Sequence, residues 1–256
     1  MKIKSHALVL KTTIFKESSL IIRLFTREKG KSTYIVKAAM RQKSPNKAIY
    51  QQLNEVEINY THHPKKQIHP VYSVKLINDW ENICADLKKT VLCTSMLEII
   101  DKSYDEEIPD TKTYDTLQSV MLYFDHNNKN LNNAFYYFIL HFLKNSGYDI
   151  LSAKKHPIIL RFQQKNPNLL DDLNLIFDLD LSGMHKSKNM PNYERKIMTR
   201  FMSELVRYHF PDVKSFKVQK IYLVRFPVRY FKNSFPRFNH FKFFSSNLFN
   251  VFFIKF

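Results

Sequence analysis

The sequence predicts an α+β protein, in which a small five-stranded β-barrel is followed by a mainly α-helical domain. Short β-branched or alternating stretches cluster early in the 256-residue chain, and apolar residues recur at helical spacing after them. The charge changes at the same place, because residues 1–80 are strongly basic, 81–150 are acidic and 151–256 are basic again. We therefore assign residues 1–80 to a barrel domain, 81–215 to a helical domain and 216–256 to a basic, Phe-rich tail.

The predicted barrel consists of five short strands, over residues 6–14, 20–26, 32–39, 53–61 and 71–77. In the fourth strand, Val56, Ile58 and Tyr60 alternate with polar residues, which is typical of a half-buried strand. Gly30 follows the second strand and can supply the positive φ of a tight hairpin. Because no helical period interrupts these strands, they predict a closed or nearly closed barrel. The oligonucleotide-binding (OB) fold is the five-stranded barrel of this size.

Three helices are expected directly after the barrel. The first follows Asp86, and the second begins at the start signal Pro109-Asp110-Thr111. Asn130 is expected to cap the third helix, which should end at Gly147, since glycine favours the residue just beyond a helix.

The remainder of the chain is less regular. We expect a short helix within residues 157–167, a strand-like stretch over 175–181 and a further helix over 192–209. From residue 221 onward there are no acidic residues and half of the chain's 22 phenylalanines. We expect this tail to pack irregularly. The alternative is a basic-aromatic arm that stacks on bases or enters a membrane interface.

Composition narrows the class of function. A net charge of +17 points to a polyanionic partner, either nucleic acid or an acidic membrane surface. The chain has three glycines, too few and too scattered for a phosphate-binding loop, a dinucleotide fingerprint or a nucleophile elbow. We find neither a long apolar span nor a signal-peptide pattern, so we expect a cytoplasmic protein without a membrane partner.

No catalytic or metal-binding pattern emerges from the sequence. His62, His63 and His69 share one loop, but they lack the paired spacing and the nearby carboxylate or thiolate of a zinc site. Asp178 and Asp180 share one face of the predicted strand-like stretch, without a third carboxylate in register. We therefore expect a protein that is not an enzyme and that carries neither a metal nor a cofactor.

The candidate DNA-binding residues lie on and around the second and third strands. On an OB barrel, the nucleic acid crosses these two strands and adjacent loops clamp it. Cations gather there, and Tyr34 and Tyr60 are expected to offer stacking faces to bases. The candidates are Arg23, Arg27, Lys31, Tyr34, Lys37, Arg41, Lys43, Lys47, Lys65 and Lys66.

The N-terminal half resembles a known family. The segments that carry the resemblance read HALVLKT, ESSLI, LFTREKGK and RQKS, over residues 6–12, 17–21, 24–31 and 41–44. In this order and spacing they resemble the start of the bacterial RecO family of DNA repair proteins. The resemblance is good over residues 1–150 and loose over 150–215.

The resemblance implies a recombination mediator, located in the cytoplasm with the nucleoid. Such a protein binds single- and double-stranded DNA, anneals complementary strands, and acts with RecR and the single-strand-binding protein to load RecA. Lys37, Arg41, Lys43 and Lys47 match the basic barrel face of the family. The helical domain is expected to receive the acidic, Phe-ended tail of the single-strand-binding protein, and the candidate contact residues are Phe138, Phe142 and Lys144.

Two departures and two alternatives accompany this interpretation. Many members of the family carry a four-cysteine zinc element, which cannot exist here because no cysteine follows Cys93. The stretch after about residue 217 has no counterpart that we recognise in the family. One alternative is a peripheral membrane protein with a basic surface. The other is an RNA-binding module built on the same barrel.

Overall fold

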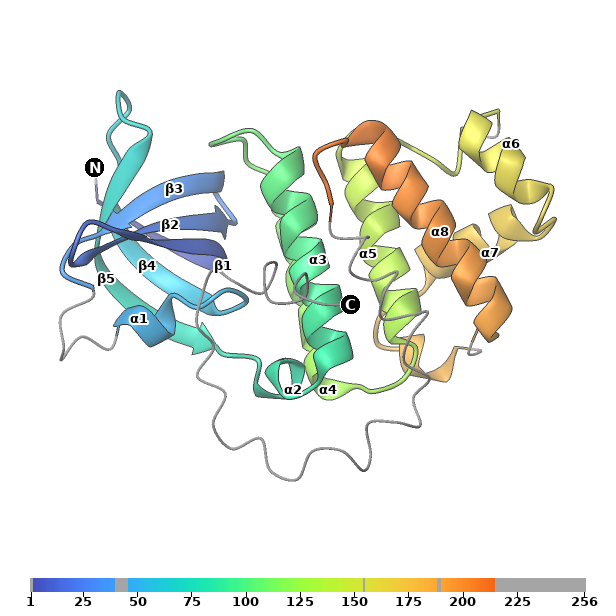
Figure 1. Cartoon of the computed structure of the whole chain (residues 1–256), viewed down its shortest axis with the longest axis horizontal. Coiled ribbons are helices and arrows are strands. Elements are labelled where there is room, and N and C mark those ends of the chain that lie inside the picture. Colours follow the sequence, from blue (N-terminus) through green and yellow to red (C-terminus); the bar gives the residue numbers. More distant parts are fainter. Residues whose placement is uncertain (1, 40–45, 154, 188–189, 215–256) are drawn as a thin grey trace, which may run out of the picture.

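A closed β-barrel forms the N-terminal part of the computed structural model, which describes residues 2–39, 46–153, 155–187 and 190–214 (Figure 1). The strand order is β1-β2-β3-β5-β4, and β1 closes the ring by pairing with β4. The β3–β5 pair is parallel and the other pairs are antiparallel. The strands are β1 (Lys2–Phe15), β2 (Ser19–Thr26), β3 (Gly30–Val36), β4 (Glu55–Thr61) and β5 (Ile68–Asn78), with helix α1 (Asn46–Ile49) between β3 and β4. The predicted five-stranded barrel is confirmed.

Side-chain alternation fills the barrel with its own small core. In β4, Val56, Ile58 and Tyr60 are buried as the sequence predicts, and they pack with Ile22 and Leu24 of β2. Glu55 is an exception to the expected polar face, because it is fully buried at the start of β4. Asn78 donates a hydrogen bond to its carboxylate at 2.5 Å, and Gln118 of the helical region donates another.

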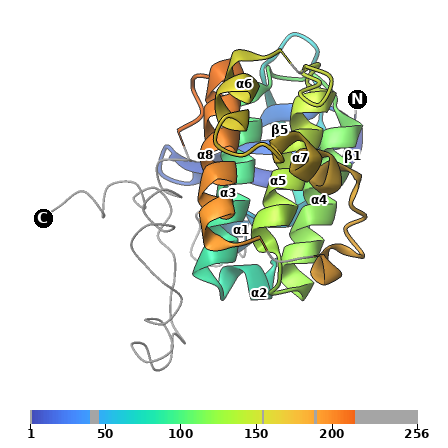
Figure 2. The same cartoon turned by 90° about the vertical axis from the view of Figure 1, so that its right-hand side faces the viewer.

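The helical region stacks beside the barrel. In Figure 1, α3 and α4 stand between the barrel and helices α5 to α8, and α6 lies at the end far from the barrel. Viewed from the helical side, α5 lies between α4 and α8 (Figure 2). The elements are α2 (Glu81–Cys84), α3 (Leu87–Ser103), α4 (Thr111–His126), α5 (Leu131–Asn145), α6 (Pro157–Gln163), α7 (Leu169–Asp178), the 3-10 turn η1 (Met184–Lys186) and α8 (Asn192–His209). Within the described residues, none of these helices is both long and apolar enough to span a bilayer.

The helix ends show which local signals were correct. Asp86 and Asp110 cap α3 and α4 as predicted, each accepting a hydrogen bond from a backbone N–H three residues on. Gly147 ends α5 with φ +89°, and the N–H of the next residue donates to the carbonyl of Leu143. Asn130 is the N-cap residue of α5 at the predicted position, but its side-chain oxygen accepts no capping bond, and its NH2 group donates to the carbonyls of Met184 and Ser187 instead.

The strand-like stretch predicted over residues 175–181 is wrong. Residues 175–178 of this stretch form the last turn of α7, a helix in which Leu169, Leu173 and Ile176 are buried at helical spacing. The alternation in the sequence came from the helix end and the loop that follows it. Asp178 therefore ends a helix, and Asp180 lies beyond it rather than on the same strand face.

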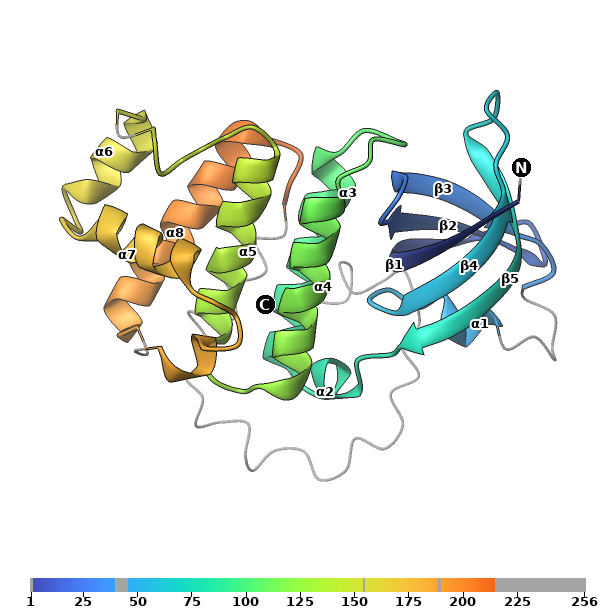
Figure 3. The ribbon, with the colours of Figure 1, turned by 180° about the vertical axis from the view of Figure 1, so that it is seen from behind.

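The barrel and the helical region share a core. Leu8, Leu10 and Phe25 point out of the barrel and join the same buried cluster as the helices. The loop between α3 and α4 also lies against the barrel, as the opposite view shows (Figure 3). There the Glu107 N–H donates to the Lys31 carbonyl at 2.7 Å, which fixes the loop beside the start of β3.

Candidate nucleic-acid interface

Three of the predicted DNA-binding cations face the helical region. Arg23 donates to Asp101 at 2.6 Å, and Arg27 makes two hydrogen bonds with the Asp115 carboxylate at 2.8 and 2.9 Å. The Lys31 ammonium is largely buried and donates to the Asp101 carbonyl at 2.9 Å. These side chains are engaged in docking two parts of the chain, which corrects the expectation that they lie free on a phosphate-binding face.

Where the barrel meets the helical region, a contact that we call the junction, basic side chains of the barrel pair with acidic side chains of the helical region. The hydrogen bond from Arg27, assisted by its charge, lowers the pKa of Asp115 below its usual range. The guanidinium of Arg23 also lies 3.9 Å from Glu106, whose carboxylate accepts a bond from Thr33 of β3. Acidic groups of the helical region therefore occupy the end of the β2–β3 face where a nucleic-acid backbone was expected.

Tyr34 does not offer a stacking face, and that prediction is wrong. Its ring is fully buried inside the barrel, edge-on to Tyr60 with a centroid separation of 5.0 Å. Burial raises the pKa of Tyr34 well above its ordinary value. Tyr60 is buried as well, so both rings serve the barrel core.

Other predicted cations are accessible or lie outside the described residues. Lys37 is exposed just beyond β3, and Lys65 and Lys66 are exposed in the loop between β4 and β5. Arg41 and Lys43 belong to residues 40–45, which the structure does not describe. Lys47 lies in α1, and its side chain is likewise outside the description.

Two candidate DNA-binding residues at the β4–β5 hairpin, Tyr72 of β5 and Lys2 of the neighbouring β1, were missed in the sequence analysis. Tyr72 of β5 is 54% exposed, and the Lys2 ammonium lies 5.7 Å from the centroid of its ring. Lys2 reaches this place because β1 begins at residue 2, four residues earlier than predicted, and pairs with Thr61. The Lys-Ile-Lys alternation at the N-terminus was the available signal. We call Lys2, Lys65, Lys66 and Tyr72 the hairpin surface.

The predicted peptide contact on α5 is wrong for its two phenylalanines. Phe138 and Phe142 are fully buried, with nearly parallel rings whose centroids lie 6.0 Å apart. They fill the helical core and cannot contact a partner. Lys144 is exposed, and its ammonium lies 4.6 Å from the ring centroid of Phe177 on α7.

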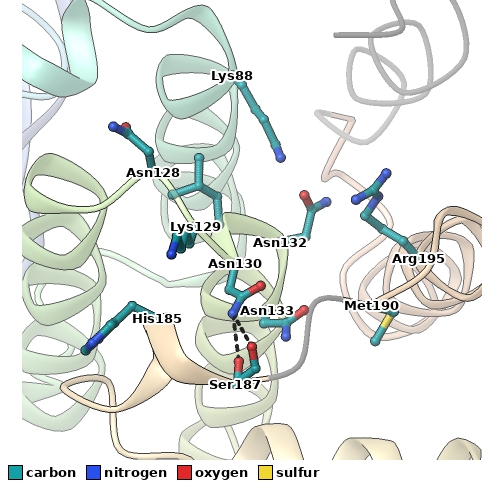
Figure 4. A pocket seen from close by; sticks show the side chains of 11 residues that line it. Lys88, Asn128, Lys129, Asn130, Asn132, Asn133, His185, Ser187, Met190 and Arg195 are labelled. Atoms are coloured by element: carbon teal, nitrogen blue, oxygen red, sulfur yellow. Dashed lines mark hydrogen bonds between the residues drawn. The ribbon is translucent and has the colours of Figure 1, made fainter.

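A hollow of about 450 Å³ lies elsewhere in the helical region, between α3, the start of α5, η1 and α8. Its cations are Lys88, Lys129 and Arg195, and the apolar side chains of Leu131 and Met190 also line it. Figure 4 shows Lys88 and Arg195 on the same side of the hollow as Asn132, with His185 across from them. Partial burial and the neighbouring Arg195 charge both lower the pKa of Lys88, as expected where cations crowd together. The hollow therefore favours an anionic ligand.

One side-chain cluster in the described residues could hold a metal ion. Its ligand atoms come from His62, His69 and Glu107, and all lie within 4.8 Å of one another. The sequence analysis rejected a metal here for want of a nearby carboxylate. The carboxylate exists, but it lies 38 residues further along the chain than His69.

The fold and the accessible cations place the chain in a class. A closed five-stranded barrel with this strand order is an OB fold, here joined to a helical region. Two family models match the chain in succession, "Recombination protein O N terminal" over residues 1–80 and "Recombination protein O C terminal" over residues 84–152. Together they match more than half of the chain, and the chain belongs to the RecO family of DNA repair proteins.

Curated relatives agree with the family models over most of the chain. The DNA repair protein RecO of Flavobacterium psychrophilum is 26% identical over 86% of this chain and 98% of its own length. RecO of Flavobacterium johnsoniae is 25% identical over 84% of this chain and 94% of its own. RecO of Phocaeicola vulgatus is 22% identical over 85% and 97%, respectively. The resemblance found in the sequence is thus confirmed, and with it a role in DNA repair.

Proposed function

We propose that this protein is a recombination mediator that binds single- and double-stranded DNA and anneals complementary strands. It acts with RecR and the single-strand-binding protein to load RecA, in the cytoplasm near the nucleoid. In this proposal residues 1–80 bind DNA, and residues 81–215 bind a partner. The proposal depends on one combination: the chain belongs to a DNA repair family, and its OB barrel exposes Lys65 and Lys66 in the loop between β4 and β5.

The hairpin surface supplies the physical basis for DNA binding. Lys65 and Lys66 are exposed at the loop between β4 and β5, one of the loops by which OB folds hold oligonucleotides. Tyr72 offers an accessible ring on the adjoining strand. Annealing requires no covalent step by a side chain, because a cationic scaffold lowers strand repulsion while base pairing supplies the free energy.

The salt dependence of single-strand binding tests this surface. Each lost phosphate contact on a single strand reduces the log–log salt slope by about 0.7. Lys65→Ala with Lys66→Ala removes two such contacts, so it should flatten the slope by about 1.4 and weaken binding. Arg41→Ala with Lys43→Ala should do the same if residues 40–45 also contact DNA.

A charge-matched control separates contact from net charge. Lys102→Ala with Lys112→Ala removes two exposed lysines from α3 and α4 and should leave the slope unchanged. Equal slopes in the hairpin and control variants would contradict the hairpin surface. Competition by RNA of the same sequence tests the alternative of an RNA-binding module. Flotation with anionic vesicles tests the alternative of a peripheral membrane protein.

We also propose that the hollow beside Lys88 receives the acidic, Phe-ended tail of the single-strand-binding protein. It offers what the buried Phe138–Phe142 pair cannot, namely accessible cations beside apolar side chains. Charge-assisted hydrogen bonds from Lys88 and Arg195 suit a terminal carboxylate, and Leu131 and Met190 suit a terminal ring.

Fluorescence polarisation with a labelled acidic peptide ending in Asp-Phe tests this assignment. Lys88→Gln should weaken binding by at least about tenfold, the worth of a charge-assisted bond. Lys144→Gln removes an exposed lysine from the same region and should leave the affinity unchanged. Weaker binding by Lys144→Gln and unchanged binding by Lys88→Gln would instead place the peptide site at α5.

A further inference from the structure

Three side chains from separate segments meet where the barrel touches the helical region. His62 follows β4, His69 lies in β5, and Glu107 lies in the loop between α3 and α4. Their ligand atoms lie within 4.8 Å of one another, and His69 Nε2 is 2.5 Å from Glu107 Oε1. The rings of His62 and His69 have a centroid separation of 4.7 Å.

The barrel fixes the position of His69. The residue is 1% exposed and pairs with Tyr34 in the parallel β3–β5 ladder. Its ring packs against the rings of Tyr34 and Tyr60, with centroids 5.9 and 6.1 Å away. The backbone N–H of His63 donates to Nδ1 of His69 at 3.4 Å, which is a long hydrogen bond. This bond only weakly favours the tautomer with the proton on Nε2. The proton can therefore move to Nδ1, which leaves Nε2 free to bind a metal ion.

Backbone contacts with the barrel fix the position of the loop that carries Glu107. Glu107 has φ +62°, and its N–H donates to the Lys31 carbonyl at 2.7 Å. The next residue, Ile108, brings its carbonyl against Gly30 so closely that a Cβ there would lie 1.9 Å from the oxygen. The carboxylate is thus delivered to His69 by backbone contacts, while its 38% exposure leaves it room to adjust.

We propose that His62, His69 and Glu107 form a binding site for one divalent transition-metal ion, with Zn²⁺ as the best fit. Two imidazoles and one carboxylate are a ligand set that zinc accepts, with water in the fourth position. Imidazole also selects zinc and its neighbours over Mg²⁺ and Ca²⁺, which prefer oxygen ligands. This site is unrelated to a four-cysteine element and goes beyond the proposed function.

The geometry requires a small adjustment on binding. Zinc bonds of about 2.0–2.2 Å in a tetrahedral arrangement place two ligand atoms roughly 3.3 Å apart. The Glu107 carboxylate must therefore move away from His69 by less than about 1 Å, and ligand atoms that lie up to 4.8 Å apart must approach each other by up to about 1.5 Å. Both histidines flank the Lys65–Lys66 loop, so a bound ion would tie this loop of the hairpin surface to the helical region.

Titration of the full chain with zinc chloride, after removal of metals with a chelator, tests the proposal. We expect one tight equivalent of zinc and no comparable binding of magnesium chloride. His62→Gln and Glu107→Gln should each weaken that equivalent by more than about 100-fold, because outer-shell changes alone cost 10- to 100-fold. Both substitutions spare the buried His69.

The neighbouring His63 provides the matched control. His63→Gln should retain the tight equivalent, since the side chain of His63 is outside the ligand set. In the wild type, Co²⁺ should give the intense visible bands of a tetrahedral site, and Glu107→Gln should lose them. The absence of a tight equivalent in the wild type, or its persistence in both ligand variants, would overturn the proposal.

Discussion

Arg27 and Asp115 illustrate how single residues of this chain serve docking rather than DNA. The two side chains form a bidentate pair across the junction between β2 and α4. Because the pKa of Asp115 is lowered below its ordinary value of 3.8, its ionised form stabilises the folded state. That stabilisation is present above about pH 3.8 and is lost as the pH falls through the lowered pKa.

Asp115→Asn should therefore reduce stability near neutral pH, and the loss should shrink as the pH falls below 3.8 toward the lowered pKa. Urea unfolding across a pH series from neutral to acid measures the difference, and the exposure of the Arg27–Asp115 pair keeps the effect small. Asp212→Asn, at an exposed residue after α8, serves as the control. A loss of stability that stays the same across the pH series would show that the charge of Asp115 does not stabilise the contact between the barrel and α4.

Tyr34, which the sequence suggests as a stacking residue, is buried, whereas Tyr72 offers an exposed ring. Tyr34→Leu should lower the free energy of unfolding by about 2 kcal/mol, since it shortens a fully buried side chain, and should spare DNA affinity. Tyr72→Ala should weaken single-strand binding by about 5- to 150-fold through a lost stacking ring, and should spare stability. Urea unfolding and fluorescence anisotropy with a labelled oligonucleotide separate the two effects. Weaker DNA binding by folded Tyr34→Leu would contradict this division.

The sequence predicted the location of cations better than their partners. Positive charge around β2 and β3 was evident, but the carboxylates that engage Arg23 and Arg27 lie 78 and 88 residues away. Such pairing depends on how the barrel meets α3 and α4, and no local pattern encodes it.

At the scale of elements, the turn between β2 and β3 positions the whole junction. Gly30 has φ +66° and admits the Ile108 carbonyl into the space that a side chain would fill. Gly147 also has a positive φ, at +89°, but faces open space. Substitution of Gly147 therefore tests the backbone conformation alone, whereas substitution of Gly30 also introduces a steric clash with Ile108.

Gly147→Ala should destabilise the protein by about 1 kcal/mol, the cost of a left-handed conformation. Gly30→Ala should cost at least about 1 kcal/mol more, because it must also push the α3–α4 loop away from the barrel. Chemical denaturation of both variants measures the difference. Equal losses would mean that the loop does not press on Gly30 in solution.

Element prediction succeeded where signals are local. Alternation located the strands of the barrel, and Asp86, Asp110 and Gly147 marked helix ends by their own chemistry. It failed over residues 175–181, because a short apolar stretch fits either period until its packing partners are known. The N-terminal extension of β1 was missed for a similar reason, since its partner β4 lies more than 50 residues away.

For the whole molecule, the sequence indicated an OB barrel followed by helices, and the family models confirm this order. It did not reveal the cationic hollow or the His62–His69–Glu107 cluster. Each is assembled from segments far apart in the chain, so each exists only once the tertiary structure is formed. Paired groups such as Arg23–Asp101 and Arg27–Asp115 join the barrel to the helical region, whereas Lys65, Lys66 and Tyr72 of the hairpin surface are exposed.

Annealing of two complementary labelled oligonucleotides, followed by fluorescence across a salt series without nucleotide, tests the central claim most directly. A mediator that works by screening phosphate repulsion should accelerate annealing without ATP, and the acceleration should fall steeply as salt rises. Lys65→Ala with Lys66→Ala should slow annealing more than Lys102→Ala with Lys112→Ala. Tight binding of a single strand without acceleration, or acceleration that is insensitive to salt, would contradict the account.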